Sequence, residues 1–273
     1  MTGLYDWVQT PAGQHAMIWE RAQLDAALAD VFGYHALQLG LADMDALAAN
    51  RMPHRWLALG SQDAPRQAQT GATSTGATRA RVALVADPAA LPFPAESLDL
   101  VVLPHTLELS RNPHASLREV QRVLVHEGKV AITGINPLSL WGFRQWRARQ
   151  WRRLGLERRL YLPDVGEFIS PQRLRDWLRL LEFEVESIAY GCWQPAVRSV
   201  RALERFAWLE KAGRRWYPFL GAAYCVLAVK RTQGATLVGP AWLAAPKVAA
   251  APVSIAGRAG PARAPAQNNC ETH

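Results

Sequence analysis

The sequence predicts an α/β protein with an open, mostly parallel, seven-stranded sheet and helices on both faces. Short apolar segments recur along the chain and mostly alternate with segments of helical periodicity, which is typical of parallel sheets joined by helical crossovers. Two of these segments, 81–86 and 98–103, are followed directly by polar or kinked residues. These are Asp87 after the first segment and Pro104-His105 after the second. Ligands bind at the carboxyl ends of such strands, so we expect a site there.

The first elements are one helix and two short strands. A helix is predicted over 10–33, because Thr10 can cap it, Pro11 suits its first turn and Gly33 suits a left-handed stop. Its apolar face is expected to contain Ile18, Ala22, Ala26, Leu28 and Phe32. Strands are expected at 35–41 and 55–60, a helix or turn at 43–49 between them, and a polar loop at 61–80.

The later elements continue the alternation. A helix is expected to begin at Asn112-Pro113 and to end at Gly128, where a further strand starts. Its apolar face contains Leu117, Val120 and Leu124. A second well-marked helix begins at Ser170-Pro171. The remaining segments are strands at 184–189 and 222–231, with helical structure at 195–215 between them.

Length and composition set the domain organisation. A chain of 273 residues suits one large α/β domain with an appendage. We expect an N-terminal helical extension at 1–34, a domain at 35–231 with a basic, tryptophan-rich insertion or lid at 141–169, and a disordered Ala-, Pro- and Gly-rich tail at 232–273. The start lacks the pattern of a signal peptide, and three widely spaced cysteines form neither a disulfide framework nor a metal knuckle. These features predict a cytoplasmic protein without a metal site.

Positive charge is concentrated in one segment. Residues 141–160 contain seven arginines and one glutamate, a net charge of +6 in a chain of net charge +8. Arginines at 147, 149, 152 and 153 are expected to contact the phosphates of RNA or of lipid head groups. The alternative is a solvated helix whose tryptophans pack at the sheet edge as a lid over the cleft. The tryptophans at 141, 146 and 151 are five residues apart and therefore form no single stripe.

A family resemblance sharpens the expected chemistry. Residues 82–137 contain an acidic residue after a strand, a Leu-Pro-Phe corner, an Asp-Leu-Val strand, an Arg-Val-Leu helix end and a glycine turn before the next strand. This series resembles the central block of class I S-adenosylmethionine-dependent methyltransferases, with a type 11 methyltransferase domain and a Rossmann-like sheet. The stretch from Thr10 to Leu41 also resembles a poorly characterised bacterial group of methyltransferase-like proteins. The resemblance implies S-adenosylmethionine as cofactor.

The resemblance also implies which residues bind the cofactor. These are Gly40, Ala42, Asp87, Pro88, Pro104 and His105, with the Asp87 carboxylate accepting a hydrogen bond from the adenine amine; the alternative is that Asp87 only caps a turn. The family's glycine-rich loop is reduced here to Gly40, followed by Leu41 and Ala42. Side chains at those two positions are expected to crowd a close backbone approach.

The resemblance leaves the acceptor and the base open. Methyl transfer needs mainly alignment, and a base only where the acceptor must lose a proton. The candidates for catalysis are His105 and Glu108, three residues apart after a strand. The alternative is that Glu108 pairs with Arg111 while His105 lines the cleft.

Two functions follow from the sequence. The first is a methyltransferase of unknown acceptor. The second is an inactive protein of the same fold that contacts an anionic partner through its arginines. A dinucleotide-dependent oxidoreductase is disfavoured, because no Gly-x-Gly-x-x-Gly turn follows any strand.

Overall fold

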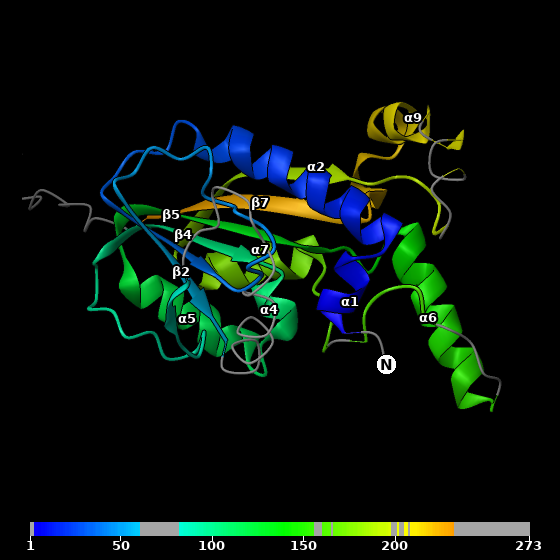
Figure 1. Ribbon diagram of the computed structural model, residues 1–273, viewed down its shortest axis with the longest axis horizontal. Helices are drawn as coiled ribbons and strands as arrows, with labels where there is room; N and C mark the ends of the chain where they lie inside the picture. The colour runs from blue at the N-terminus through cyan, green and yellow to red at the C-terminus, as the bar shows by residue number, and fades with distance from the viewer. Residues whose placement is uncertain are drawn as a thin grey trace, which may run out of the picture. The chain divides into compact units, whose positions relative to one another are not determined.

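The predicted seven-stranded sheet is confirmed. The computed structural model describes residues 3–60, 82–155, 160–164, 166–197, 201, 205–206 and 208–231, and the predicted loop at 61–80 and tail at 232–273 lie outside these residues. The described strands are β1 (His35–Leu39), β2 (His54–Leu59), β3 (Val82–Val85), β4 (Leu98–Pro104), β5 (Leu124–Ile135), β6 (Phe183–Gly191) and β7 (Ala223–Lys230). They lie side by side in the order β3-β2-β1-β4-β5-β7-β6 (Figure 1).

Strand direction explains where a ligand can bind. Strand β1 pairs in parallel with β2 on one side and β4 on the other, while β7 runs antiparallel between β5 and β6. The chain order reverses at β1, because the sheet grows outward through β2 and β3 on one side and through β4 and β5 on the other. The carboxyl ends of β1 and β4 therefore mark the switch point, where parallel sheets bind ligands.

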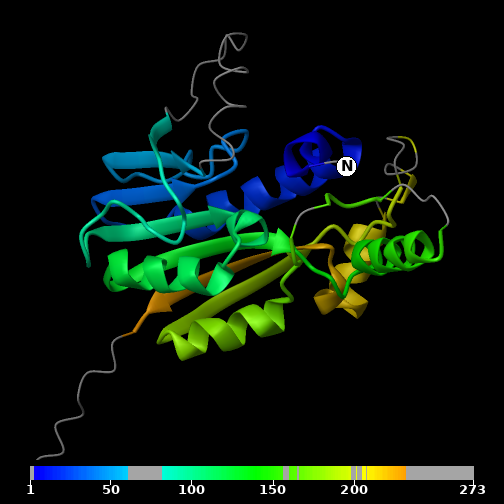
Figure 2. The same ribbon diagram turned by 90° about the horizontal axis from the view of Figure 1, so that it is seen from below.

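Helices cover both faces of the sheet, as predicted. The described helices are α1 (Leu4–Val8), α2 (Pro11–Leu28), α4 (Thr106–Leu109), α5 (Pro113–Val123), α6 (Leu140–Arg153), α7 (Pro171–Leu180), α9 (Trp208–Trp216) and the 3-10 turn η1 (Pro218–Leu220). Helices α1 and α2 pack on one face, and α5 and α7 pack on the other (Figures 1 and 2).

Strand periodicity divides the core between those two faces. In β4, Leu100 and Val102 pack in the cluster of buried residues that includes α1 and α2. The alternating residues Val101 and Leu103 pack in the cluster that includes α5 and α7. Successive side chains of a strand point to opposite faces, so a strand buried on both faces is apolar throughout.

The predicted helix starts are confirmed. Thr10, Asn112 and Ser170 each accept a hydrogen bond from a backbone N–H of the first helical turn, and a proline follows each one. Ser139 caps α6 in the same way through Gly142 N–H, at 3.1 Å. Such caps satisfy donors that have no partner within the helix.

The predicted glycine stops were wrong. Helix α2 ends at Leu28, and Gly33 instead allows a close approach, because a Cβ there would lie 2.5 Å from the Asp99 Cβ. Helix α5 ends at Val123, and β5 already runs through Gly128; the left-handed residue beside it is Glu127, at φ 61°.

The predicted apolar face of α2 was wrong except at Leu28, which is fully buried. Ile18 and Phe32 are exposed. The buried face instead contains Ala12, Gly13, Ala16, Glu20, Leu24 and Leu28. These residues follow one another mostly at intervals of four, which places them on one side of the helix. The sequence prediction chose a different face because Glu20 interrupts the apolar series.

Candidate cofactor-binding site

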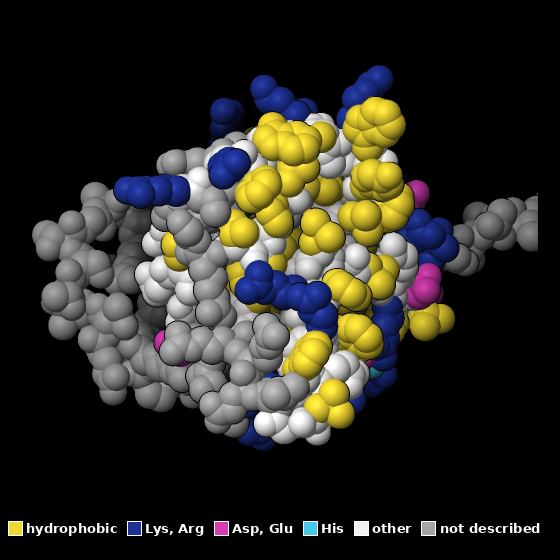
Figure 3. All heavy atoms as spheres, turned by 90° about the vertical axis from the view of Figure 1, so that its right-hand side faces the viewer, with side chains coloured by type: hydrophobic (Ala, Val, Ile, Leu, Met, Phe, Trp, Pro, Cys, Tyr) yellow, Lys and Arg dark blue, Asp and Glu magenta, His cyan; other side chains and the backbone are white. Residues whose placement is uncertain are grey.

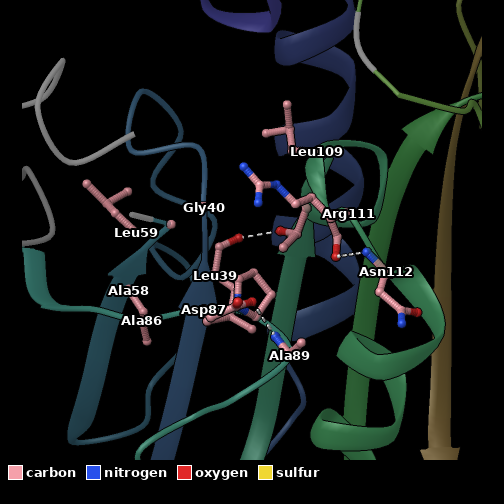
Figure 4. A pocket seen from close by; sticks show the side chains of 14 residues that line it. Leu39, Gly40, Ala58, Leu59, Ala86, Asp87, Ala89, Leu109, Arg111 and Asn112 are labelled. Carbon is pink, nitrogen blue, oxygen red and sulfur yellow. Dashed lines mark hydrogen bonds between the residues drawn. The ribbon is translucent and has the colours of Figure 1, made fainter. Parts of the chain in front are cut away.

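A cavity of about 310 Å³ opens at the carboxyl ends of the parallel strands (Figure 4). Its walls come from the ends of β1, β2 and β3 and from the segment that follows β4. The lining residues are Leu39, Gly40, Ala58, Leu59, Gly60, Ala86, Asp87, Pro88, Ala89, Thr106, Leu109, Ser110, Arg111 and Asn112. The cavity therefore lies beside the switch point of the sheet, as the strand ends predict.

Bare backbone forms the wall at the end of β1. Gly40 has a φ of +80°, and a Cβ there would lie 3.3 Å from the Thr106 hydroxyl. The expected crowding by Leu41 and Ala42 is not found, because neither residue lines the cavity. Leu41 is fully buried in the core, and Ala42 packs with Leu57 and Leu59. A ligand can thus reach the backbone of Gly40 although the loop contains a single glycine.

Asp87 brings a carboxylate to the opposite wall. It follows β3 and accepts a hydrogen bond at Oδ1 from the Ala89 N–H, at 2.9 Å. Its Oδ2 has no hydrogen-bond partner among the described residues. Asp87 therefore closes a turn and also offers one free oxygen to a ligand. Pro88 lies beside it in the same wall.

The cavity wall contains one cation. Arg111 extends from the loop between α4 and α5 toward the mouth of the cavity (Figure 4). Among the described lining residues, Asp87 and Arg111 are the charged ones. The site therefore presents one negative and one positive group to a ligand.

Pro104 and His105 lie behind the wall. Neither residue lines the cavity, and the next residue, Thr106, does. His105 adopts a left-handed conformation, with φ 54°, at the start of α4. The Thr106 hydroxyl donates a hydrogen bond to the Leu39 carbonyl. This turn after β4 thereby fixes the end of β1 next to Gly40.

A buried network of three ionisable side chains holds that turn. The His105 ring lies between two carboxylates, with Nε2 3.0 Å from Glu20 Oε1 and Nδ1 2.8 Å from Glu108 Oε2. The second oxygen of each carboxylate accepts a hydrogen bond from β5. Glu20 Oε2 accepts from the Thr133 hydroxyl at 3.0 Å, and Glu108 Oε1 accepts from the Ile135 N–H at 2.6 Å. The network joins α2, α4 and β5, and Glu108 pairs with His105 rather than with Arg111.

Electrostatics favour the charged form of His105 in this network. Burial alone would lower the pKa of His105, but the carboxylates of Glu20 and Glu108 outweigh burial and hold that pKa well above its usual value. Burial raises the pKa of Glu108, although the neighbouring His105 opposes the shift. All three side chains are buried and none lines the cavity. The geometry makes them a clamp for the turn rather than groups in contact with a ligand.

The four arginines predicted to contact phosphates, at 147, 149, 152 and 153, lie on α6, and Arg158 and Arg159 lie outside the described residues. Arg149 and Arg152 lie 3.7 and 4.0 Å from the Asp164 carboxylate. Arg147 and Arg153 form no ion pair with a described residue, and none of the four lines the cavity. No described residue of α6 lines the cavity.

The sequence analysis did not identify four residues of the cavity wall or the buried Glu20. The four residues of the wall are Thr106, Ser110, Arg111 and Asn112. They all follow β4, so applying the rule of strand ends to the whole segment between β4 and α5 would have identified them. Glu20 escaped because its partner His105 is distant in sequence. Among the described residues, no group of three or more His, Cys, Asp or Glu side chains is arranged to hold a metal ion.

The match to a family model agrees with the cavity. Residues 55–132 match the model of a methyltransferase domain. The chain is 30% identical over 179 residues to the Escherichia coli K12 protein YafS, described as uncharacterized, and the match covers 66% of this chain and 65% of YafS.

Solved structures show the same fold. A Thermotoga maritima S-adenosylmethionine-dependent methyltransferase, described as a possible histamine N-methyltransferase, superposes with a TM-score of 0.54 at 14% identity, covering 81% of this chain and 91% of that one. An Archaeoglobus fulgidus S-adenosylmethionine-dependent methyltransferase gives a TM-score of 0.51 at 15% identity, with coverages of 78% and 94%. Residues 55–132 therefore match a methyltransferase domain, and the chain shares the fold of these S-adenosylmethionine-dependent methyltransferases.

Proposed function

We propose that the protein is an S-adenosylmethionine-dependent methyltransferase. The observation that supports this most directly is the cavity at the switch point of a methyltransferase sheet, with bare backbone at Gly40 and a free carboxylate oxygen at Asp87. The Asp87 Oδ2 would accept from the adenine amine, and the Gly40 backbone would lie against the methionine part. Arg111 would pair with the cofactor's carboxylate.

The protein's share of the chemistry is alignment. The bound cofactor supplies a methyl group that its sulfonium centre already activates. The described cavity wall brings apolar surface, backbone groups and two charges, but no histidine, cysteine or lysine. His105 and Glu108 position the turn that presents Thr106 to the cavity. A nucleophilic acceptor held in line with the methyl group requires no further base where it has no proton to lose.

Calorimetric titration with S-adenosylmethionine tests the proposal. We expect micromolar binding and a loss of about tenfold to a hundredfold in Asp87→Asn, because a bond to a charged acceptor is lost. The asparagine keeps Oδ1 for the Ala89 N–H but turns an amide donor toward the adenine amine. Asp176→Asn, on the exposed side of α7, is the matched control and should bind as the wild type does.

Absent or millimolar binding by the wild type would contradict the enzyme assignment. The protein would then be the inactive, methyltransferase-fold binding protein that the reduced glycine loop suggests. Equal affinity of the wild type and Asp87→Asn would remove Asp87 from the site while keeping the function.

We also propose an anionic acceptor or partner and a cytoplasmic location. Helix α6 contains five arginines and no acidic residue, which supports the anionic partner.

The cysteines at 192 and 225 are buried free thiols, which suits a reducing compartment. Within the described part of the chain, no helix is long and apolar enough to cross a membrane.

A further inference from the structure

Hydrophobic side chains gather on the face of the molecule that carries α6 and α9 (Figure 3). We name eight of them the apolar platform, and each is more than half exposed. They are Leu138, Leu140, Phe143, Trp146, Leu154, Trp216, Tyr217 and Phe219. The Asn136 side chain joins the two parts, because it precedes α6 and donates to the carbonyls of Phe219 and Gly221 at 3.0 Å each. Exposed apolar surface on this scale marks an interaction site.

The outward-facing side of α6 is fixed by its buried side. Trp141 is fully buried and packs edge-on against Trp7 at 6.2 Å and Tyr161 at 5.6 Å between ring centroids. Its indole N–H donates to the Gln194 carbonyl at 2.8 Å. On the opposite side, Phe143 and Trp146 stack on each other at 5.9 Å. The packing of Trp141 in the core therefore fixes the orientation of α6 and keeps Phe143 and Trp146 on its solvent-exposed side.

Positive charge accompanies the apolar platform. Lysine and arginine side chains lie around and between the hydrophobic ones (Figure 3). On α6, Arg147 and Arg153 lack an acidic partner among the described residues, and on α9 the same is true of Arg214 and Arg215. The one acidic residue of α9, Glu210, faces His15 at 3.2 Å. The partner should therefore be anionic as well as apolar.

Three occupants would meet this surface differently. A second copy would place two sets of unpaired arginines together, which like-charge repulsion disfavours. RNA can stack on the aromatic rings, but the leucines at 138, 140 and 154 have no flat face to offer a base. A bilayer with acidic head groups accepts aliphatic and aromatic side chains at its interface and pairs with arginine at its surface.

From this complementarity we infer that the apolar platform docks the protein on the surface of an anionic lipid bilayer. The leucines, Phe143 and Trp146 enter the head-group and acyl boundary, and the free arginines contact lipid phosphates. This interaction goes beyond the proposed methyl transfer and does not require it. The platform follows β5 at the carboxyl edge of the sheet, the edge that also holds the cavity.

Sedimentation with lipid vesicles tests the inference. The full chain, without cofactor, is mixed with vesicles of phosphatidylglycerol and phosphatidylcholine in equal parts, or of phosphatidylcholine alone. We expect binding to the first only. Phe143→Ser with Trp146→Ser should weaken it at least about tenfold, because two large apolar groups no longer enter the interface. Arg147→Gln with Arg153→Gln should weaken it by about fivefold per arginine, and less at high salt.

The matched control is Phe32→Ser with Leu180→Ser. Both residues are highly exposed and lie at the amino ends of β1 and β6, away from the platform, so this variant should bind as the wild type does. Equal binding by the wild type and the Phe143–Trp146 variant would overturn the inference. So would a loss of binding in the Phe32–Leu180 control that equals the loss in the Phe143–Trp146 variant. So would retention of transfer RNA without binding to vesicles. Because no cofactor is present, any of these results leaves the proposed function intact.

Discussion

The buried His105 shows how a single residue makes the protein's stability depend on pH. Its pKa is held well above the ordinary value by Glu20 and Glu108 against the opposing effect of burial. A raised pKa in the folded state means that folding takes up a proton, so this contribution is full below the unfolded pKa of about 6.5 and declines as pH rises through the folded pKa. The raised pKa of Glu108 acts in the same direction.

We therefore expect His105→Gln to lower the free energy of unfolding by about 3 kcal/mol at pH 6, because two carboxylates lose the cation between them. The difference from the wild type should shrink as the pH becomes alkaline. Urea unfolding from pH 6 to 10 measures it, with the exposed His126→Gln as control. A difference that grows with pH would mean that His105 is neutral in the folded protein.

Helix α6 has a buried face and an exposed face, and each contains a tryptophan. Trp141 on the inner face is fully buried, whereas Trp146 on the outer face is 57% exposed. We expect Trp141→Ala to lower the free energy of unfolding by about 3–5 kcal/mol, because it opens a cavity between Trp7 and Tyr161. Trp146→Ala should change it by about 0.5 kcal/mol or less.

Thermal and urea unfolding of the two variants check this contrast. Similar losses in both would mean that the outer face of α6 is packed within the molecule, and the apolar platform would then not be free to bind a bilayer. A loss confined to Trp141→Ala would establish that the aromatic outer face contributes little to folding.

The sequence predicted the elements and the position of the site more fully than the contacts within them. The rule of strand ends led to Asp87, and the family resemblance added Gly40 and Pro88. The structure brings these three residues together around one cavity. These features are local, so a sequence displays them. The buried pairing of Glu20 with His105 depends on two segments that meet only in the fold. Without its partner, an acidic residue within an apolar series indicates an exposed position.

At the scale of the whole molecule, the cavity and the apolar platform share one edge of the sheet but no residue. The cavity is built on the ends of β1 to β4, and the platform on the segments that follow β5 and precede β7. A bilayer on the platform would therefore bring membrane-resident acceptors toward the cofactor without covering the cofactor's own site. This geometry gives a thermodynamic expectation, because two ligands on separate surfaces of a rigid fold bind without coupling.

We expect the affinity for S-adenosylmethionine to change less than about twofold when anionic vesicles saturate the protein. Known allosteric effectors change an affinity by about fivefold or more, so the coupling free energy between the two sites would be close to zero. Equilibrium dialysis of labelled cofactor, with and without vesicles, measures it. Vesicles of phosphatidylcholine alone are the control. A loss of affinity that grows with the anionic lipid would mean that the bilayer covers the cavity mouth near Arg111. The docking surface would then extend past α6 to the loop between α4 and α5.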